Sequence, residues 1–244
     1  MRSLYLDHAA SELDAASQKA ISRNETPTWL LDHLMREQLR VQLETRARAA
    51  LKRSAIFPLT AMDTYDFNYP DSIDRDLVSR AMTLDFIRDK TNCVFVGPSG
   101  VGKTHLANAI GQLACLRGHR VRFVVAADLV NDLVAGQARN TLHRRLLAWA
   151  APDLLIIDEL GYLSFDARGA DLLYQIFNKR YGSPTIPRRH QRSSTVVTTN
   201  LPFKDWGTLF HNSAAASAIA DRLVHKGLLV RITGKSRRSD TAVE

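Results

Sequence analysis

Short apolar runs alternate with amphipathic segments through residues 91–244. Each run holds four or five apolar or β-branched residues, which is typical of strands buried in a parallel sheet. The runs predict strands at Cys93–Val96, Val121–Val125, Leu154–Ile157, Thr195–Thr198 and Leu228–Ile232. Between them, helical spacing of apolar residues predicts helices at Thr104–Leu116, Asp128–Ala135, Thr141–Ala150, Ala167–Tyr181 and Ala214–His225. The alternation predicts an α/β core, in which helices flank a five-stranded parallel sheet.

The segment before this core has a different pattern. Residues 1–26 are polar and alanine-rich without clear periodicity, so we expect a leader without regular structure. Residues 27–57 repeat apolar positions at helical spacing between many basic residues, and predict a basic helical N-terminal region that ends at a Phe-Pro pair. Residues 58–90 are expected to hold an aromatic linker and then the first helix of the core, around Asp74–Ile87.

The composition predicts a folded protein of the cell interior. Of the 244 residues 45% are apolar, and a chain of this length can build a core without disulfides or structural metal. No apolar run approaches the roughly 18 residues that span a bilayer, and Asp7, Glu12 and Asp14 stand where a signal peptide is apolar. Cys93 and Cys115 lie in apolar stretches and are expected to be reduced packing residues. The sequence therefore predicts a cytoplasmic protein without membrane contact.

Basic residues are in excess and occur in clusters. The 33 Lys and Arg outnumber the 25 Asp and Glu, and six basic residues without an acid fall both within 172–204 and within 222–239. One such run is often only a solvated face, but several together favour a nucleic acid partner. Since no base-reading motif accompanies them, we expect largely sequence-independent contact with duplex DNA. The candidate contacts are Arg36, Arg40, Arg46, Arg48, Lys52, Arg53, Arg188, Arg189 and Arg192. For the N-terminal helix, a surface that docks a partner protein is the alternative.

A phosphate-binding motif follows the first predicted strand. Residues 97–104 read Gly-Pro-Ser-Gly-Val-Gly-Lys-Thr and match the P-loop pattern between a strand and a helix. Glycines let backbone N–H groups point at phosphate oxygens, at the positive end of the next helix. Lys103 then reaches the β- and γ-phosphates of ATP, and the Thr104 hydroxyl binds Mg²⁺. The predicted nucleotide contacts are Gly97, Pro98, Ser99, Gly100, Val101, Gly102, Lys103 and Thr104.

An acid pair ends the third predicted strand. Asp158 and Glu159 follow a buried apolar run, at the carboxyl edge where parallel α/β sheets bind ligands. We expect Asp158 to hold Mg²⁺ and Glu159 to polarise an attacking water as general base. This pair favours ATP hydrolysis over transfer to a hydroxyl or simple binding. A solvated turn is the alternative for the pair.

Two further candidates depend on their context. Asn200 follows the fourth predicted strand and would orient the attacking water if that strand neighbours the first and third. A turn residue is the alternative, because Asn before Leu-Pro often has that role. Arg222 lies on the predicted helix before the last strand, where an ion pair with Asp221 is the simpler interpretation.

Four sequence runs together resemble the IstB-like transposition helper ATPases, of the AAA+ class and close to the DnaC/DnaA initiator branch. They are residues 97–107, 154–163 (Leu-Leu-Ile-Ile-Asp-Glu-Leu-Gly-Tyr-Leu), 198–206 (Thr-Thr-Asn-Leu-Pro-Phe-Lys-Asp-Trp) and 220–226 (Ala-Asp-Arg-Leu-Val-His-Lys). The resemblance implies an ATP- and Mg²⁺-dependent ATPase that assembles as a homo-oligomer on duplex DNA and helps a partner transposase select and join its target.

The resemblance also implies roles for single residues. Asn200 matches sensor 1, Arg222 matches the arginine finger that reaches a neighbouring subunit's ATP, and the nucleotide contacts extend to His105. Only about a dozen residues follow the last predicted strand, so we expect no C-terminal helical lid.

Other functions share parts of this pattern. A helicase loader of the DnaC type would use the same nucleotide residues with a different partner. A non-catalytic scaffold, in which ATP only holds protein on DNA, is disfavoured by the acid pair. A GTPase is disfavoured because Asn178-Lys179 is followed by Arg180-Tyr181, which is no guanine motif.

Overall fold

A six-stranded sheet forms the centre of the computed structural model, which describes residues 6–162, 165–181, 193–210, 213–225 and 227–236. The strands lie in the order β1-β6-β2-β5-β4-β3. Their bounds are β1 Ser72–Ile73, β2 Cys93–Val96, β3 Val121–Val125, β4 Leu154–Leu160, β5 Ser194–Thr199 and β6 Leu228–Thr233. Strands β2 to β6 are parallel and confirm the five predicted strands. Strand β1 pairs antiparallel with β6 and was not predicted, because two residues carry no periodic signal.

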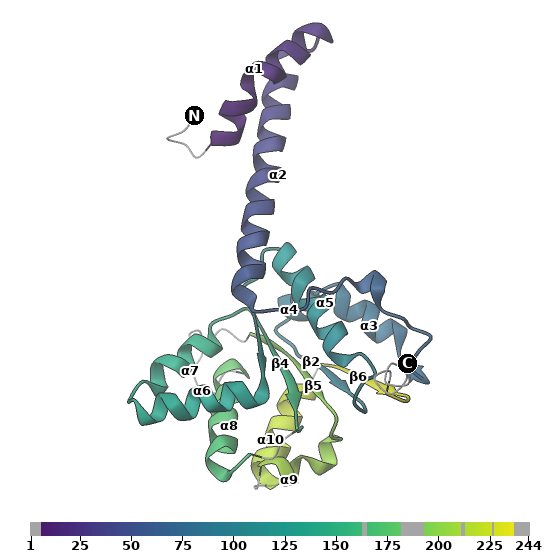
Figure 1. Ribbon diagram of the computed structural model, residues 1–244, viewed down its shortest axis with the longest axis vertical. Coiled ribbons are helices and arrows are strands. Elements are labelled where there is room, and N and C mark those ends of the chain that lie inside the picture. The colour runs from purple at the N-terminus through teal and green to yellow at the C-terminus, as the bar shows by residue number, and fades with distance from the viewer. Residues whose placement is uncertain (1–5, 163–164, 182–192, 211–212, 226, 237–244) are drawn as a thin grey trace, which may run out of the picture.

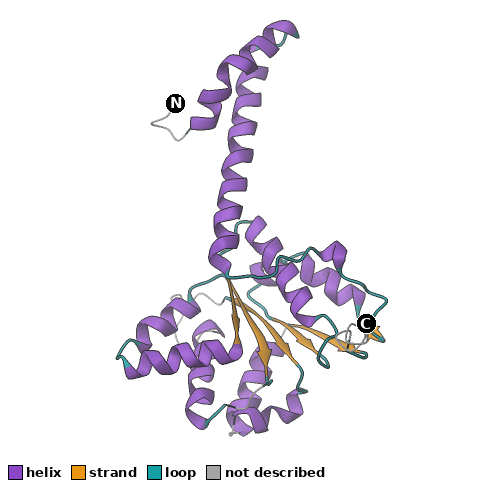
Figure 2. Cartoon of the chain, in the orientation of Figure 1, coloured by secondary structure: helices purple, strands orange, loops and turns teal. Residues whose placement is uncertain are grey.

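Helices cover both faces of the sheet (Figure 2). On one face lie α3 Arg75–Met82, α4 Asp85–Arg88 and α5 Lys103–Leu116. On the other lie α6 Ala126–Ala138, α7 Leu142–Ala150, α8 Ala167–Tyr181, α9 Trp206–Phe210 and α10 Ser213–Val224. The 3₁₀ turns η2 Met62–Thr64 and η3 Phe203–Asp205 lie in the connections. The predicted helix at 74–87 is two helices, because Leu84 between them has a left-handed φ of 65°.

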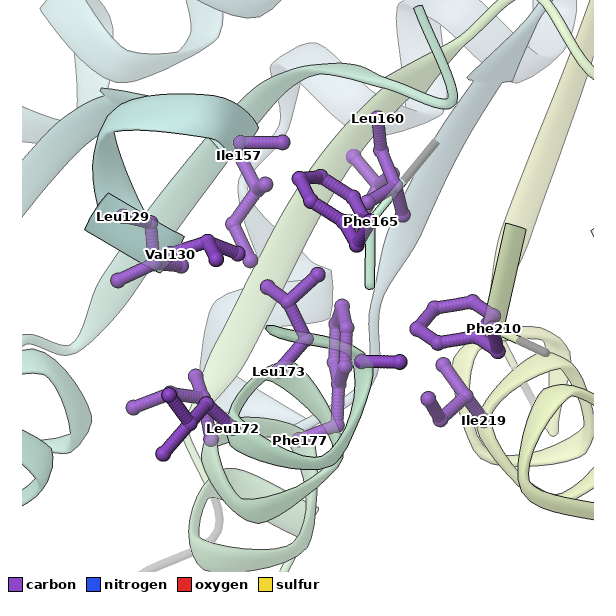
Figure 3. Packing of buried hydrophobic residues seen from close by; sticks show 14 of the residues in the cluster. Leu129, Val130, Ile157, Leu160, Phe165, Leu172, Leu173, Phe177, Phe210 and Ile219 are labelled. Atoms are coloured by element: carbon purple, nitrogen blue, oxygen red, sulfur yellow. The ribbon is translucent and has the colours of Figure 1, made fainter. Parts of the chain in front are cut away.

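Alternate residues of each strand pack into two separate cores. Cys93 and Phe95 of β2 face α3 to α5, whereas Val94 of the same strand faces α6 to α10. In the second core, Leu173 and Phe177 of α8 lie between the sheet and the helices α9 and α10 (Figure 3). Both cysteines are free and buried, as predicted. This burial on both faces fixes the register of the strands, and so the place of each residue at the carboxyl edge.

Residues 7–54 form a helical hairpin that extends away from the sheet (Figure 1). Helix α2 spans Pro27–Ser54, and the Thr26 hydroxyl caps it by accepting the Trp29 N–H at 3.2 Å. Helix α1, Asp7–Ser22, packs back against α2, where the Ala9 N–H donates to the Gln38 side chain at 2.9 Å. The prediction of an irregular leader is wrong for α1. Its buried positions are alanines, which add little to a hydrophobic pattern yet let two helices approach closely.

Arg180 is 1% exposed and joins three elements at the amino edge of the sheet. Its guanidinium donates to the carbonyls of Trp149, Ala150 and Pro152, and so satisfies the end of α7. It also donates to the Thr195 hydroxyl and the Ser194 carbonyl of β5. Burial lowers the pKa of Arg180 to about 9. These carbonyl bonds compensate for the buried charge, so Arg180 is a structural residue.

The sequence predicted neither a C-terminal helical lid nor a membrane span, and the described residues bear on both points. No helix follows β6 there, where the described chain ends at Ser236. None of the described helices combines the length and the apolar character that a bilayer span requires.

Candidate active site

The P-loop connects β2 to α5 at the carboxyl edge of the sheet. Gly100 and Gly102 have φ angles of 80° and 89°, a left-handed conformation that favours glycine. The Gly97 N–H donates to the Thr199 carbonyl at 3.1 Å and so anchors the loop to β5. A Cβ at Gly97 would lie 2.2 Å from the Ile232 carbonyl oxygen of β6. The glycines are therefore required both by backbone conformation and by close packing.

Replacing Gly97 with alanine is expected to destabilise the fold by about 1–3 kcal/mol. The added methyl group would clash with the backbone of β6, which cannot move aside as a side chain can. Gly207→Ala is a matched control, since nothing lies within 4 Å of its Cβ position. Urea unfolding measures both variants. Equal unfolding midpoints for the two variants would contradict this prediction, because they would show that β6 shifts to accommodate the methyl group without loss of stability.

A cavity of about 220 Å³ opens over the P-loop. The Lys103 ammonium lies across the loop and donates to the carbonyls of Gly97 at 2.8 Å and Pro98 at 2.6 Å. The cavity is lined by Ser99, Gly100, Gly102, Lys103, Thr104, His105, Glu159, Tyr162, Thr198 and Asn200. The sequence-predicted residues of P-loop, acid pair and fourth strand therefore meet at one place.

Three of the predicted nucleotide contacts do not line this cavity. Gly97 and Pro98 line a neighbouring cavity that also contains Arg231. Val101 is 2% exposed and belongs to the core, and its carbonyl accepts a hydrogen bond from the Tyr65 hydroxyl. These residues shape the loop and do not form the wall of the cavity.

Asp158 is buried beside the start of α5. The Thr104 hydroxyl lies 3.0 Å from each Asp158 carboxylate oxygen, and the Thr198 hydroxyl donates to Oδ1 at 2.5 Å. Hydroxyl and carboxylate oxygens are the ligands that Mg²⁺ prefers, so Thr104 and Asp158 fit this ion. Across the described ranges, no group of three or more His, Cys, Asp or Glu side chains is arranged to hold a metal ion. Mg²⁺ commonly takes only one or two protein ligands and completes its shell with water and phosphate.

Glu159 faces the opposite way from Asp158. It is exposed at the cavity, and its φ of 58° is left-handed, which is uncommon for a residue other than glycine. Its N–H donates to the Thr198 hydroxyl at 2.9 Å. Asn200 is also exposed and lines the same cavity from the end of β5. Because β5 lies between β2 and β4, the condition set for Asn200 in the sequence is met.

The linker between α2 and the core contacts the P-loop region. The Thr60 hydroxyl donates to the His105 carbonyl, and the His105 ring lies 3.3 Å from the Thr64 hydroxyl. The Tyr65 ring packs edge-on against His105, at 5.5 Å between centroids. The sequence predicted only an aromatic linker here, because contacts over some 40 residues leave no local pattern. Thr198 and Tyr162 were missed as site residues as well, although both lie within the motif runs.

Arg222 lies away from this cavity. It borders a small cavity with Asn92 and Thr195, at the amino ends of β2 and β5 and so at the opposite edge of the sheet. Its guanidinium packs over the rings of Tyr174 and Tyr181, at 5.4 and 5.7 Å from their centroids. The hydrogen bond from Arg222 lowers the pKa of the Tyr174 phenol. Arg222 therefore does not join the catalytic candidates of its own chain.

The basic residues of α2 differ in their partners. Arg36 pairs with Asp32, and Arg40 pairs with Glu37 and Glu44. Arg46 and Arg53 line a groove of about 760 Å³ between α2 and the end of α5. Arg48 and Lys52 are exposed. The remaining candidates, Arg188, Arg189 and Arg192, lie outside the described residues.

The whole chain, residues 1–244, matches the sequence profile of one protein family, described as IstB-like ATP binding protein. The chain belongs to this family. An insertion sequence IS5376 ATP-binding protein from Geobacillus stearothermophilus is 33% identical over 96% of this chain and 90% of its own length. An insertion sequence IS21 ATP-binding protein from Pseudomonas aeruginosa is 32% identical over 95% of this chain and 82% of its own.

Solved structures share the fold of this IstB-like protein. The DnaC helicase loader has a TM-score of 0.56 at 22% identity, over 71% of this chain and 97% of that one. The replication initiator DnaA, bound to AMPPCP and single-stranded DNA, has a TM-score of 0.56 at 20% identity, over 73% of this chain and 51% of that one. The predicted α/β fold is thereby confirmed, and it is similar to the folds of DnaC and DnaA. ATP is the ligand that the family description names.

Proposed function

We propose that this IstB-like protein is an ATPase that assembles on duplex DNA and helps a partner transposase select and join target DNA. The main support for ATPase activity is that Lys103, Glu159 and Asn200 line one cavity, beside the Thr104–Asp158 pair. The insertion-sequence names of the relatives support the transposition role. Steady-state phosphate release with and without DNA tests the proposal, and a protein that binds ATP but never releases phosphate would instead be the DNA-coating scaffold.

In the proposed reaction, the residues of the cavity divide the work. P-loop N–H groups and the Lys103 ammonium bind the β- and γ-phosphates, for which the ammonium exchanges its carbonyl partners. Thr104 and Asp158 would hold Mg²⁺, which would neutralise charge on the phosphates. The Glu159 carboxylate accepts a proton from the attacking water, and the Asn200 amide orients that water. Lys103 and Thr104 lie on the first turn of α5, Asp158 and Glu159 lie in β4, and Asn200 directly follows β5, so regular elements position these side chains.

A helicase loader remains the second candidate, favoured by the fold that this chain shares with nearly the full length of the DnaC structure. At 22% identity this likeness concerns the fold alone. Co-purification of the tagged protein with a transposase, or with the replicative helicase, separates the two. Recovery of the helicase alone would favour the loader.

DNA binding is proposed to depend on the basic residues of α2 that have no carboxylate partner within the described part of the chain. Replacing both Arg48 and Lys52 with alanine is expected to flatten the plot of log affinity against log salt by about two units, because each phosphate contact contributes about one. The double variant Arg36→Ala/Arg40→Ala is the control. Its slope is expected to change less, since both arginines are neutralised by acids of the same helix.

Fluorescence anisotropy of labelled duplexes of two unrelated sequences, measured across a salt series, gives these slopes. Tight binding to one duplex only, with little effect of salt, would contradict the proposal. An unchanged slope in the Arg48/Lys52 variant would mean that this face of α2 does not contact DNA. The alternative, a surface that docks a partner protein, would then be favoured.

A further inference from the structure

The acid pair lies on an irregular part of the sheet. β4 and β5 pair in regular parallel register through their first four residue pairs, and the next pair joins Leu160 to Thr199. Between these, β4 has two residues, Asp158 and Glu159, where β5 has only Thr198. A strand with one extra residue forms a β-bulge, and bulges beside active sites redirect side chains.

One hydroxyl bonds to both residues of this bulge. Thr198 Oγ1 donates to Asp158 Oδ1 at 2.5 Å and accepts the Glu159 N–H at 2.9 Å. Thr198 is 1% exposed, so bulk water has little access to replace these bonds. A buried N–H or carboxylate left without its partner is costly, and this cost makes the arrangement specific.

The two carboxylates need different surroundings, and the bulge supplies them. Asp158 is 3% exposed and is held between the hydroxyls of Thr104 and Thr198. Glu159 is exposed at the cavity, with the left-handed φ of 58° that a regular strand residue does not adopt. Such a conformation persists only where neighbouring contacts enforce it, and the bond from Glu159 N–H to Thr198 is one.

We propose that Thr198 is a positioning residue for both carboxylates. Its hydroxyl fixes Asp158 in the orientation that faces Thr104, and it fixes the backbone from which Glu159 enters the cavity. The role of Glu159 in this inference rests on the proposed ATPase function, whereas the role of Asp158 rests on Mg²⁺ binding alone. Thr198 itself donates its one proton to Asp158 and so acts through its neighbours.

The test compares Thr198→Val, which keeps the shape and removes the hydroxyl, with Thr198→Ser, which keeps the hydroxyl. Ser194→Ala is the matched control, because it removes another buried hydroxyl of β5, one that donates to the Phe86 carbonyl at 2.9 Å far from the cavity. Three quantities are measured: turnover at saturating ATP, the Mg²⁺ concentration that half-saturates binding of a non-hydrolysable ATP analogue, and the affinity for that analogue without Mg²⁺.

In Thr198→Val, we expect turnover to fall and the Mg²⁺ requirement to rise, each by about 10- to 100-fold, since hydrogen bonds to charged groups are worth about that much. Analogue affinity without Mg²⁺ should stay within about threefold, because the P-loop contacts are intact. Thr198→Ser and Ser194→Ala should stay near wild type in all three quantities.

Four results would overturn the proposal: a Thr198→Val protein with the Mg²⁺ requirement of wild type, a Thr198→Ser protein as impaired as Thr198→Val, an equal loss of Mg²⁺-free affinity, or the same defects in Ser194→Ala. The last two would assign Thr198 to folding alone. If wild type binds the analogue with Mg²⁺ but shows no turnover, the ATPase proposal fails, and the Mg²⁺ titration still decides the role of Thr198.

Discussion

Replacing Glu159 with glutamine is expected to lower ATP turnover by about 10²- to 10⁴-fold, the usual contribution of a general base. Glutamine keeps the size of the side chain but cannot accept the proton of the attacking water. ATP binding should persist, because the P-loop, Lys103 and the Thr104–Asp158 pair are unchanged. Phosphate release and equilibrium binding of a fluorescent ATP analogue measure the two effects separately.

Lys103→Ala is the matched comparison for this experiment. It removes the ammonium that lies across the P-loop, so binding itself should weaken by about 10- to 100-fold, as expected for lost hydrogen bonds to charged phosphates. The two variants thus separate binding from chemistry at one cavity. An equal loss of binding in both would refute the division of roles, and a Glu159→Gln protein with wild-type turnover would remove Glu159 from the reaction.

The P-loop could be predicted because its chemistry needs special residues in a fixed local order. Glycines at left-handed φ, a lysine and a hydroxyl between a strand and a helix leave a signal that needs no tertiary information. The five parallel strands were equally predictable, because burial on both faces makes each one a continuous apolar run.

What the sequence missed depends on contacts between distant segments. The role of Thr198 follows from the register between β4 and β5, which no run of residues within one strand contains. The contacts of Tyr65 and His105 join a linker to a helix some 40 positions later. Helix α1 was missed for another reason, since its buried positions are alanines, which add little to a hydrophobic pattern.

The place of Arg222 also follows from the order of the strands. The sequence predicted its helix, and strand order then puts its guanidinium near the amino ends of β2 and β5, away from the P-loop of its own chain. An arginine finger must reach the developing charge on the γ-phosphoryl oxygens. The proposed finger role therefore requires that Arg222 act on the ATP of a neighbouring protomer. We therefore expect hydrolysis to depend on assembly.

Arg222→Ala is expected to bind ATP like wild type yet to lose about 10³- to 10⁵-fold in turnover, the contribution typical of an arginine finger. Tyr174→Phe is the matched control, since it removes the hydroxyl group that bonds to Arg222 and keeps the ring beneath the guanidinium. Turnover of Tyr174→Phe should stay near that of wild type if Tyr174 contacts Arg222 only in the unassembled chain and has no role in the assembly. An equal loss of turnover in both variants would mean that Arg222 acts only through its contact with Tyr174.

Mixing two inactive proteins tests the action between protomers directly. Arg222→Ala retains an intact P-loop, and Lys103→Ala retains an intact arginine, so some interfaces of a mixed assembly combine one of each. We expect such mixtures on duplex DNA to regain part of the wild-type turnover, with a maximum at intermediate ratios. Co-sedimentation with DNA verifies that both variants enter the same assembly. If they do and the mixture stays inactive at every ratio, Arg222 acts only within its own chain, through its packing on Tyr174 and Tyr181.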